Sequence, residues 1–338
     1  MKRAVTLRDL ARELGVSVSA VSKALKGDPG IGPATTARIR QLAQERRYVP
    51  NQAARHLKQR HNFKIGVILP DLLDEFFALT LHGVEAAATQ HGYMVLIAQT
   101  HEDPDKEAQF IETMLRNRVD GVLIATTTHT YKTDALDHLE TIGIPVVYFA
   151  RAPHDHTRYS VTSDNVGGSR QAVAHLIAKG HRRIAHLRGP YTLLLSQQRH
   201  EGYEMALREH GIPYDTRLVK TIDLSVADTQ QAMRELLALP DPPTALLAFR
   251  SYVMLDAIQY LKTHAPRPPQ LIDCVGYGHL SLLKHVAYRP LASVEADPVE
   301  LGSRAFGWLL QRLAAPTDWP VDERHLRVPC GLIVYEPV

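Results

Sequence analysis

Cysteine is scarce in this sequence, whose 338 residues include only Cys274 and Cys330. Both lie in apolar, strand-like runs, so we expect two free, buried thiols in a reducing compartment. The histidines and carboxylates at 101–103 and 154–156 lack a third ligand at metal spacing. We therefore expect neither a disulfide nor a metal site.

Long hydrophobic runs are also missing. No segment approaches the 18 consecutive apolar residues of a membrane span, and no apolar stretch follows the basic residues at 2–3, so we expect no signal peptide. These absences predict a soluble, cytoplasmic protein with no membrane partner.

The motifs of several enzyme classes are absent too. Gly167 and Gly168 open a predicted helix, but the dinucleotide-binding pattern G-x-G-x-x-G does not occur. Neither a G-x-S-x-G elbow nor a Walker sequence is present. The 18 histidines are scattered along the chain. We expect no enzyme and no cofactor.

Positive charge is concentrated at the N-terminal end. Residues 1–62 hold four Lys and nine Arg against two Asp and two Glu, a net charge of +9, whereas the whole chain carries only +3. A basic segment on a mildly acidic body indicates that this segment meets a polyanion. The length and the 45% apolar content allow two or three domains with sizeable cores.

Residues 6–26 predict two short helices joined by a tight turn. Thr6 stands at an N-cap position, Asp9 favours the positive end of the helix dipole, and Gly15 can end the first helix in a left-handed conformation. Ser17 can cap the second helix. The inward positions are Leu7, Leu10, Ala11 and Leu14 in the first helix and Ala20, Val21, Ala24 and Leu25 in the second.

This pair of helices is a candidate helix-turn-helix. The outward side chains of its second helix are Val18, Ser19, Ser22, Lys23 and Lys26. Short, hydrogen-bonding or cationic groups of this kind can enter a major groove and contact base edges and phosphates. The residues alone leave open a small helical subdomain with a solvated polar face.

A third helix and a short basic helix are predicted next. Pro33 suits a first helical position after the turn residues at 27–33, and the helix closes near Tyr48. Pro50 breaks it, and Asn51 can cap a short helix over 52–58. A helix so short is marginal in water, so we expect it to fold only against DNA or a second copy. An ordinary charged linker is the alternative.

From Lys64 the pattern alternates between strands and helices, which indicates βαβ units in two doubly wound parallel-sheet lobes. Ligands bind beyond the carboxyl ends of such strands, so the cleft between the lobes is the expected small-molecule site. The predicted strands are 65–69, 93–97, 121–124, 145–149, 184–187, 218–222, 245–249 and 272–277. The predicted helices are 76–91, 104–118, 134–142, 167–179, 197–210, 226–238 and 252–263.

Several segments resemble the lactose-repressor (LacI) type of bacterial transcriptional regulator. In the head they are TLRDLA at 6–11, LGVSVSAVSKAL at 14–25 and YVPNQAARHL at 48–57. In the body, in the family's order, they are IGVILPD at 65–71, EFF at 75–77, RVDGV at 118–122, DN at 164–165, GHRRIA at 180–185 and RHEGY at 199–203. The head motif is highly specific, and the weaker body motifs are strong together.

The resemblance implies an all-α helix-turn-helix domain at 1–49, a hinge helix and linker at 50–62, and a periplasmic-binding-protein-like α/β core at 63–338. The proximal lobe of this core would take about 63–161 and 292–320, and the distal lobe about 162–290 and 321–338. The chain would cross between the lobes three times.

The resemblance also implies a homodimer that binds a pseudo-palindromic double-stranded DNA operator. Val18, Ser19 and Lys23 match the positions that usually read the major groove, and Leu57 matches the one that wedges into the minor groove. The implied DNA-binding residues are Thr6, Ser17, Val18, Ser19, Ser22, Lys23, Lys26, Asn51, Ala54, Arg55, Leu57 and Lys58. No leucine heptad follows the last strand, which favours a dimer over a tetramer.

In such regulators a ligand in the cleft changes the angle between the lobes and thereby orders or releases the hinge helices. Here the cleft departs from the family pattern. Gly278 and His279 stand where an acidic residue is usual, and Arg250 begins a segment where Asn-Asp is common. Two acceptors are therefore expected to be missing and one cation added. Either the ligand is anionic, such as a sugar acid or phosphate, or no small molecule binds in the usual way.

The candidate effector-binding residues are Asp71, Phe76, Phe77, Arg151, Asp164, Arg199, Arg250 and His279. Four of these residues could instead have a purely structural role. The phenylalanines could belong to the lobe core, Asp164 could cap the helix before Gly167, and Arg199 could pair with a surface glutamate.

The sequence thus predicts a DNA-binding regulator, a repressor by preference, whose operator affinity responds to a carbohydrate-derived small molecule. A regulator of the same architecture that answers to a protein partner, or to nothing, is the first alternative. A solute-binding protein or enzyme with a basic head is the second.

Overall fold

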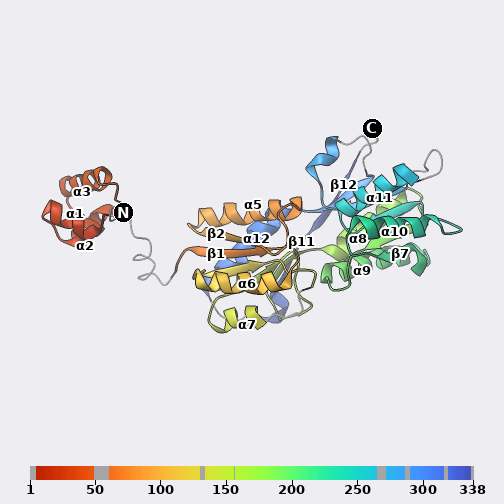
Figure 1. The fold of residues 1–338 in the computed structure, drawn as a ribbon, viewed down its shortest axis with the longest axis horizontal. Helices are drawn as coiled ribbons and strands as arrows, with labels where there is room; N and C mark the ends of the chain where they lie inside the picture. Colours follow the sequence, from red (N-terminus) through yellow and green to blue (C-terminus); the bar gives the residue numbers. More distant parts are fainter. Residues whose placement is uncertain are drawn as a thin grey trace. The chain divides into compact units, whose positions relative to one another are not determined.

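The computed structural model describes residues 5–48, 61–129, 134–155, 157–264, 272–285, 290–315 and 319–335. The chain forms two compact units, Met1–Asn62 and Phe63–Val338, which we call the head and the core. Figure 1 shows the head helices in red and the core from orange to blue. The predicted DNA-binding residues Asn51, Ala54, Arg55, Leu57 and Lys58 lie outside the described residues.

The described head consists of three helices, α1 (Leu7–Leu14), α2 (Val18–Leu25) and α3 (Pro33–Glu45). Pro33 occupies the first turn of α3, as predicted. The helices enclose one small hydrophobic core whose fully buried members are Leu10, Ala11, Val21, Ala24, Ile39 and Ala43. Leu10, Ala11, Val21 and Ala24 were predicted as inward positions by their helical spacing. The other predicted inward positions are only partly buried, namely Leu7, Leu14, Ala20 and Leu25.

The core begins with a lobe built on a six-stranded sheet of order β11-β5-β4-β3-β1-β2, with every pair parallel. We keep the name proximal lobe for it. Its strands are β1 (Lys64–Leu69), β2 (Met94–Gln99), β3 (Gly121–Ile124), β4 (Val146–Phe149), β5 (Ser160–Ser163) and β11 (His325–Val328). Its helices are α5 (Glu75–Gln90), α6 (Pro104–Arg116), α7 (Asp134–Thr141) and α12 (Pro298–Ala314).

The proximal sheet is covered on both faces. Alternate residues of β1 point in opposite directions, so Val67 packs with α5 and α12 whereas Ile68 packs with α6 and α7. Figure 1 shows α5 on one side of the strands and α6 and α7 on the other. A sheet buried on both faces requires the near-continuous apolar strands that the sequence contains.

The distal lobe has a second six-stranded sheet, of order β12-β10-β9-β8-β6-β7. Its pairs are parallel except for β12, which runs antiparallel to β10. The strands are β6 (Ile184–Arg188), β7 (Val219–Thr221), β8 (Ala245–Ala248), β9 (Asp273–Tyr277), β10 (Ala292–Ala296) and β12 (Cys330–Val334). The helices are α8 (Asn165–Ala178), α9 (Leu194–Glu209), α10 (Val226–Leu237) and α11 (Ser251–His264).

Two lobe assignments from the sequence are wrong. Strand β10 at 292–296 belongs to the distal sheet rather than to the proximal lobe, and β11 at 325–328 belongs to the proximal sheet rather than to the distal lobe. The chain crosses between β5 and α8, between β10 and α12, and between β11 and β12. The expected fold of two doubly wound lobes is confirmed.

Local differences have local causes. The strand predicted at 218–222 is shorter, because the Asp215 side chain accepts a hydrogen bond from the Arg217 amide and starts a 3-10 turn, η1 (Thr216–Leu218). Two further 3-10 turns are η2 (Ser281–His285) and η3 (Val321–Glu323). The short strand β5, the strands β10 and β11 and the helix α12 were not predicted as elements.

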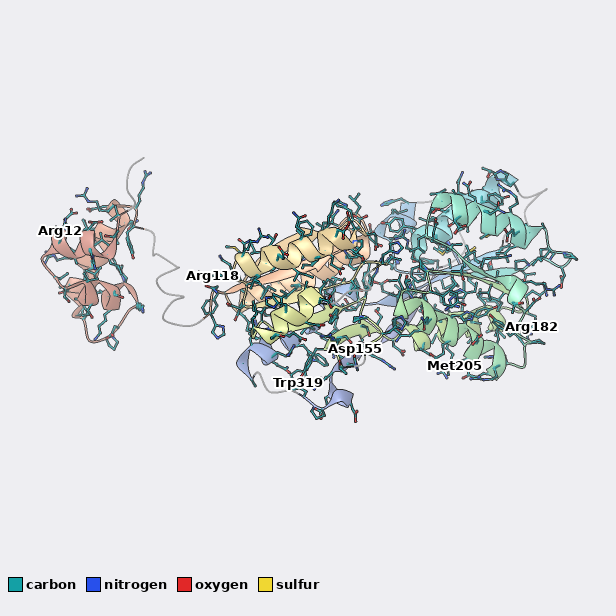
Figure 2. The ribbon with its side chains drawn as sticks, turned by 60° about the horizontal axis from the view of Figure 1, so that its bottom comes forward. Arg12, Arg118, Asp155, Arg182, Met205 and Trp319 are labelled. Atoms are coloured by element: carbon teal, nitrogen blue, oxygen red, sulfur yellow. The ribbon has the colours of Figure 1, made fainter. Side chains whose placement is uncertain are left out.

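Helices α5 and α12 pack backbone against backbone through two glycines. A Cβ added to Gly83 would lie 2.1 Å from the Val299 carbonyl oxygen, and one added to Gly302 would lie 2.0 Å from the Thr80 carbonyl oxygen. Only glycine permits this approach. Figure 2 places the labelled Trp319, which follows α12, on the proximal lobe and Arg182 and Met205 on the distal lobe.

Candidate DNA interface and effector cleft

The head holds its helix-turn-helix geometry through caps at each helix end. The Thr6 hydroxyl accepts from the Asp9 amide at 3.3 Å, while Asp9 Oδ2 accepts from the Thr6 amide at 2.9 Å, which is a complete capping box. Gly15 ends α1 at a φ of 67°, and Ser17 Oγ accepts from the Ala20 amide at 3.1 Å to begin α2. The three caps predicted from the sequence are present.

The outward face of α2 is free of packing. Val18, Ser19, Lys23 and Lys26 are exposed, and Ser22 is partly buried. An exposed valine between hydroxyl and ammonium groups offers an apolar contact, hydrogen bonds and charge on one helix face, the mixture that major-groove edges and phosphates require.

Two residues predicted to contact DNA, Thr6 and Ser17, also cap the helices of the head. The Thr6 hydroxyl donates a hydrogen bond to Asp9 Oδ2 at 2.6 Å and accepts one from the Asp9 amide. The capping box therefore uses the donor hydrogen of this hydroxyl and one of its acceptor sites. The Ser17 hydroxyl only accepts in its cap, which leaves its hydrogen available to an acceptor such as a phosphate oxygen.

Between the two lobes of the core lies a cleft of about 860 Å³, part of it open to solvent. It is lined from the proximal lobe by the start of α5 and the end of β4, and from the distal lobe by α9, the start of α11 and the ends of β9 and β10. This is the edge at which the parallel strands end, as the topology predicts. Of the predicted effector residues, six line it: Phe76, Phe77, Arg151, Arg199, Arg250 and His279.

Asp71 and Asp164 do not line the cleft. Asp71 Oδ1 accepts from the Leu73 amide at 2.9 Å in a local turn. Asp164 caps α8 by accepting from the Gly167 amide at 3.0 Å, which is the structural alternative that the sequence left open. Short-range caps and turns use up such carboxylates without any ligand.

The two phenylalanines form an apolar wall of the proximal lobe. Their ring centroids lie 5.5 Å apart at an interplanar angle of 80°. Phe77 is buried and also meets Phe149 edge-on at 6.5 Å, so it belongs both to the lobe core and to the cleft lining. Phe76 is only partly buried and presents its ring to the cleft.

Arg199 of α9 carries a positive charge into the cleft without a carboxylate partner among the described residues. Its Nε donates to Asn165 Oδ1 at 3.0 Å, and its Nη1 donates to the Phe249 carbonyl oxygen. The guanidinium lies 3.7 Å from the centroid of the Tyr277 ring and 4.8 Å from that of Phe249. Burial lowers the pKa of Arg199 to about 10, so it remains charged at neutral pH.

Arg151 and Arg250 each face a carboxylate. Arg151 Nη1 lies 2.6 Å from Glu102 Oε1, and its guanidinium lies 5.3 Å from the Phe77 ring centroid. Burial alone would raise the pKa of Glu102, but the Arg151 charge and its hydrogen bonds lower it. Arg250 Nη1 lies 3.5 Å from Asp74 Oδ2, whereas its buried Nε has no hydrogen-bond partner.

Sequence reasoning missed two carboxylates of the cleft, Asp74 and Glu295. Asp74 caps α5 by accepting from the Phe76 amide at 3.1 Å and also faces Arg250. Glu295 lies on β10, and its Oε2 accepts from the His279 amide. A single acid inside the apolar run at 292–296 was the available signal. The cleft therefore contains two carboxylates, although neither stands at the positions where the sequence indicated that acidic acceptors are missing.

Among the described residues, three contacts connect the lobes across the mouth of the cleft. Besides the pair of Arg250 and Asp74, the Ser281 amide donates to the Glu75 carboxylate at 3.1 and 3.2 Å. The Tyr252 hydroxyl donates to the Leu73 carbonyl oxygen at 3.4 Å. The contacts join the N-terminal end of α5 and the residues just before it to Arg250, to the start of α11 and to the start of η2.

The described part of the chain contains neither a cluster of metal-ligating side chains nor a membrane-length apolar helix. There, no three histidine, cysteine or acidic side chains gather closely enough to hold a metal ion. No helix there has the length and apolarity needed to cross a bilayer. Both cysteines are free and buried, as predicted.

Comparisons with known proteins match both units. The family model described as bacterial regulatory proteins, lacI family, matches residues 6–51, and that described as periplasmic binding proteins and sugar binding domain of LacI family matches residues 62–334. The HTH-type transcriptional repressor CytR of Escherichia coli (strain K12) is 30% identical over 310 residues, which cover 92% of this chain and 90% of CytR.

Two solved structures are similar over nearly the whole chain. The complex of the transcriptional regulator CelR with cellobiose is 28% identical with a TM-score of 0.72, covering 98% of each chain. The Lac repressor dimer bound to operator and the anti-inducer ONPF has a TM-score of 0.83, covering 98% of each chain. At 23% identity, the second likeness concerns the fold alone.

Proposed function

Because the chain belongs to the LacI family of bacterial DNA-binding transcriptional regulators, we propose that it represses its target genes as a homodimer on a pseudo-palindromic operator. We further propose that an acidic carbohydrate derivative, a sugar acid or sugar phosphate, binds in the cleft and sets the operator affinity. A protein with this role is a regulator and not an enzyme, and it acts in the cytoplasm, where the chromosome lies.

One observation carries the choice of an anionic effector: the partly buried guanidinium of Arg199 faces the cleft with only neutral partners among the described residues. A buried charge without an opposite charge is costly, and a ligand anion would relieve that cost. The unpartnered Nε of Arg250 offers a second donor in the same cleft. The phenylalanine wall suits the apolar face of a sugar ring.

On the DNA side, we propose that Val18, Ser19 and Lys23 contact base edges in the major groove, with Ser17, Ser22 and Lys26 on or near the phosphates. The exposed face of α2 supports this assignment. The role of Thr6 is the weakest, because its hydroxyl is committed to the capping box. Leu57, in turn, would be the hinge side chain that wedges into the minor groove, flanked by Asn51, Ala54, Arg55 and Lys58.

The experiment begins with a thermal-shift screen of the full-length protein against sugar acids, sugar phosphates, neutral sugars and nucleobases. A ligand at about 100 times its dissociation constant stabilises the native state by about 2.7 kcal/mol. For a unit of this size, that raises the midpoint by about 5 °C or more. Duplexes selected from a randomised library by the full-length protein then provide the operator, and fluorescence anisotropy measures its affinity with and without the hit.

We expect hits among the acids or phosphates and a changed operator affinity in their presence. Hits confined to neutral sugars would overturn the anionic effector while leaving a ligand-responsive regulator. Selected duplexes without a common two-fold sequence would contradict sequence-specific operator binding.

The second candidate is a regulator of the same architecture that ignores small molecules. The three contacts across the cleft mouth favour it, because they hold the lobes together without a ligand. A flat thermal-shift screen combined with tight binding to a selected operator would support this candidate. Affinity for that operator would then be insensitive to every metabolite in the screen.

A further inference from the structure

Glu295 of β10 lies beside a residue of the neighbouring strand end that has no side chain. In the parallel pair of β9 and β10, Val294 lies opposite Tyr277, so Glu295 comes next to Gly278, which has no side chain. Glu295, Gly278 and His279 all line the cleft. The neighbouring strand thus supplies a carboxylate at a point of the cleft where the residue after β9 has no side chain.

The described residues use only a small part of the hydrogen-bonding capacity of the Glu295 carboxylate. Its Oε2 accepts a hydrogen bond from the His279 amide, and no lysine, arginine or histidine side chain pairs with it within the described ranges. A carboxylate has about four acceptor sites. Burial, followed by the charges of Asp297 and Glu75, raises the pKa of Glu295 to about 7 despite that hydrogen bond.

A purely structural role of Glu295 would need only one of its two carboxylate oxygens. The bond to the His279 amide holds the turn after β9, and His279 Nδ1 continues from there to the Tyr335 hydroxyl at 2.7 Å. The remaining acceptor capacity of Glu295 faces a cleft that also contains the guanidinium of Arg199. Donors without charge, such as hydroxyl groups, fit a carboxylate that has no cation beside it.

We propose that Glu295 is an effector-binding residue that accepts hydrogen bonds from ligand hydroxyl groups, while the cleft arginines hold the ligand's anionic group. The ligand class is then a polyhydroxylated anion, in which both features are required. This inference rests on the proposed function, because it assumes that the cleft binds an effector.

The test uses isothermal titration of the full-length protein with D-gluconate, D-glucuronate and ribose 5-phosphate. Each probe is compared with its uncharged counterpart, D-glucitol, D-glucose or D-ribose, and with anions that lack hydroxyl groups, hexanoate and inorganic phosphate. We expect at least one polyhydroxylated anion to bind, and its single-feature counterparts to bind about tenfold more weakly or worse, because each loses hydrogen bonds to a charged group.

The variant Glu295→Gln separates ligand binding from the structural role. Its amide oxygen can still accept the His279 N–H, whereas its amide nitrogen cannot accept from a hydroxyl. We expect a loss of about tenfold or more in affinity for the bound probe. Glu300→Gln is the control, because Glu300 pairs with Arg304 on the surface of α12 at 2.6 Å and does not line the cleft. It should bind as the unaltered protein does.

The outcomes distinguish the two proposals. Equal affinities of Glu295→Gln and the unaltered protein for a bound sugar acid would overturn the role of Glu295 and leave the proposed function standing. Uncharged sugars that bind as well as the acids, with a loss in Glu295→Gln, would keep Glu295 and overturn the anionic effector. Absence of binding by all three acidic probes would overturn both.

Discussion

His186 of β6 makes the distal lobe sensitive to acid. Its ring is buried, stacks on the His200 ring with centroids 5.6 Å apart, and bonds through Nδ1 to the Leu247 carbonyl oxygen at 3.1 Å. Burial, assisted by the nearby charges of His200, Arg188 and Arg199, lowers the pKa of His186 to about 3. We predict that replacing it with asparagine, which keeps an N–H near the Nδ1 position, flattens the dependence of stability on pH.

The sign and size follow from proton linkage. The unfolded chain binds a proton at His186 below its ordinary pKa of 6.5, whereas the native lobe does so only near pH 3, so stability falls as the pH falls below 6.5. Between pH 8 and pH 5 this single group removes about 2 kcal/mol, since each pKa unit is worth about 1.36 kcal/mol. The value hardly changes for any native pKa well below 5.

The assay is thermal unfolding followed by far-ultraviolet circular dichroism at pH 8 and pH 5. Both tryptophans of the chain, Trp308 and Trp319, lie in the proximal lobe and pack edge-on at 5.1 Å. Their fluorescence therefore follows that lobe. A transition seen only by dichroism belongs to the distal lobe or to the small helical head, and only the distal-lobe transition contains His186.

We expect the distal midpoint of the unaltered protein to fall by about 4–8 °C more than that of His186→Asn between the two pH values. The cavity left by the substitution lowers both midpoints of the variant and cancels in this difference. Glu295, whose native pKa is raised, acts with the opposite sign between about pH 4.5 and 7 in both proteins. If the distal midpoint falls equally in the unaltered protein and in His186→Asn, the reasoning is refuted. That result would mean that His186 binds a proton as readily in the native lobe as in the unfolded chain.

Three further predictions concern DNA binding and packing. Lys23→Ala should weaken binding to a selected operator and reduce the slope of log affinity against log salt by about 1, as measured by anisotropy over a salt series, if Lys23 neutralises a phosphate. Leu57→Ala should weaken operator binding without changing the dichroism spectrum of the core, and an unchanged affinity in the anisotropy titration would contradict the wedge role. Gly83→Ala should destabilise the proximal lobe by about 1–3 kcal/mol in tryptophan-monitored unfolding, because its Cβ would meet the Val299 carbonyl oxygen at 2.1 Å. Gly307→Ala in α12 meets nothing within 4 Å and should raise stability instead, and matching losses in both variants would count against the packing argument.

Local chemistry made most secondary structure predictable. Thr6, Gly15 and Ser17 define the ends of α1 and α2 through contacts within three residues, so the sequence contains everything needed to place them. The partner of a parallel strand is different, because it depends on where a distant crossover returns. Strands β10 and β11 are both short and contain charged residues, and nothing within them indicates which sheet they join.

The cleft was predictable to the extent that charged side chains stand at strand ends. Arg151, Arg199 and Arg250 follow or face such ends and line the cleft. The carboxylates were harder, because Asp164 has the same local pattern as Asp74 and both cap helices. Only the packing of the lobes makes one a cleft residue and the other not.

The three crossings also bear on how the chain folds during synthesis. The proximal sheet receives its last strand, β11, about 160 residues after β5, and its largest covering helix, α12, arrives only shortly before. At about 5–20 residues per second, the nascent proximal lobe lacks these elements for roughly 8–30 s. Meanwhile the head can close its own core, since α1, α2 and α3 contain all of its members. A nascent or truncated chain thus acquires its DNA-binding head before it acquires either complete lobe.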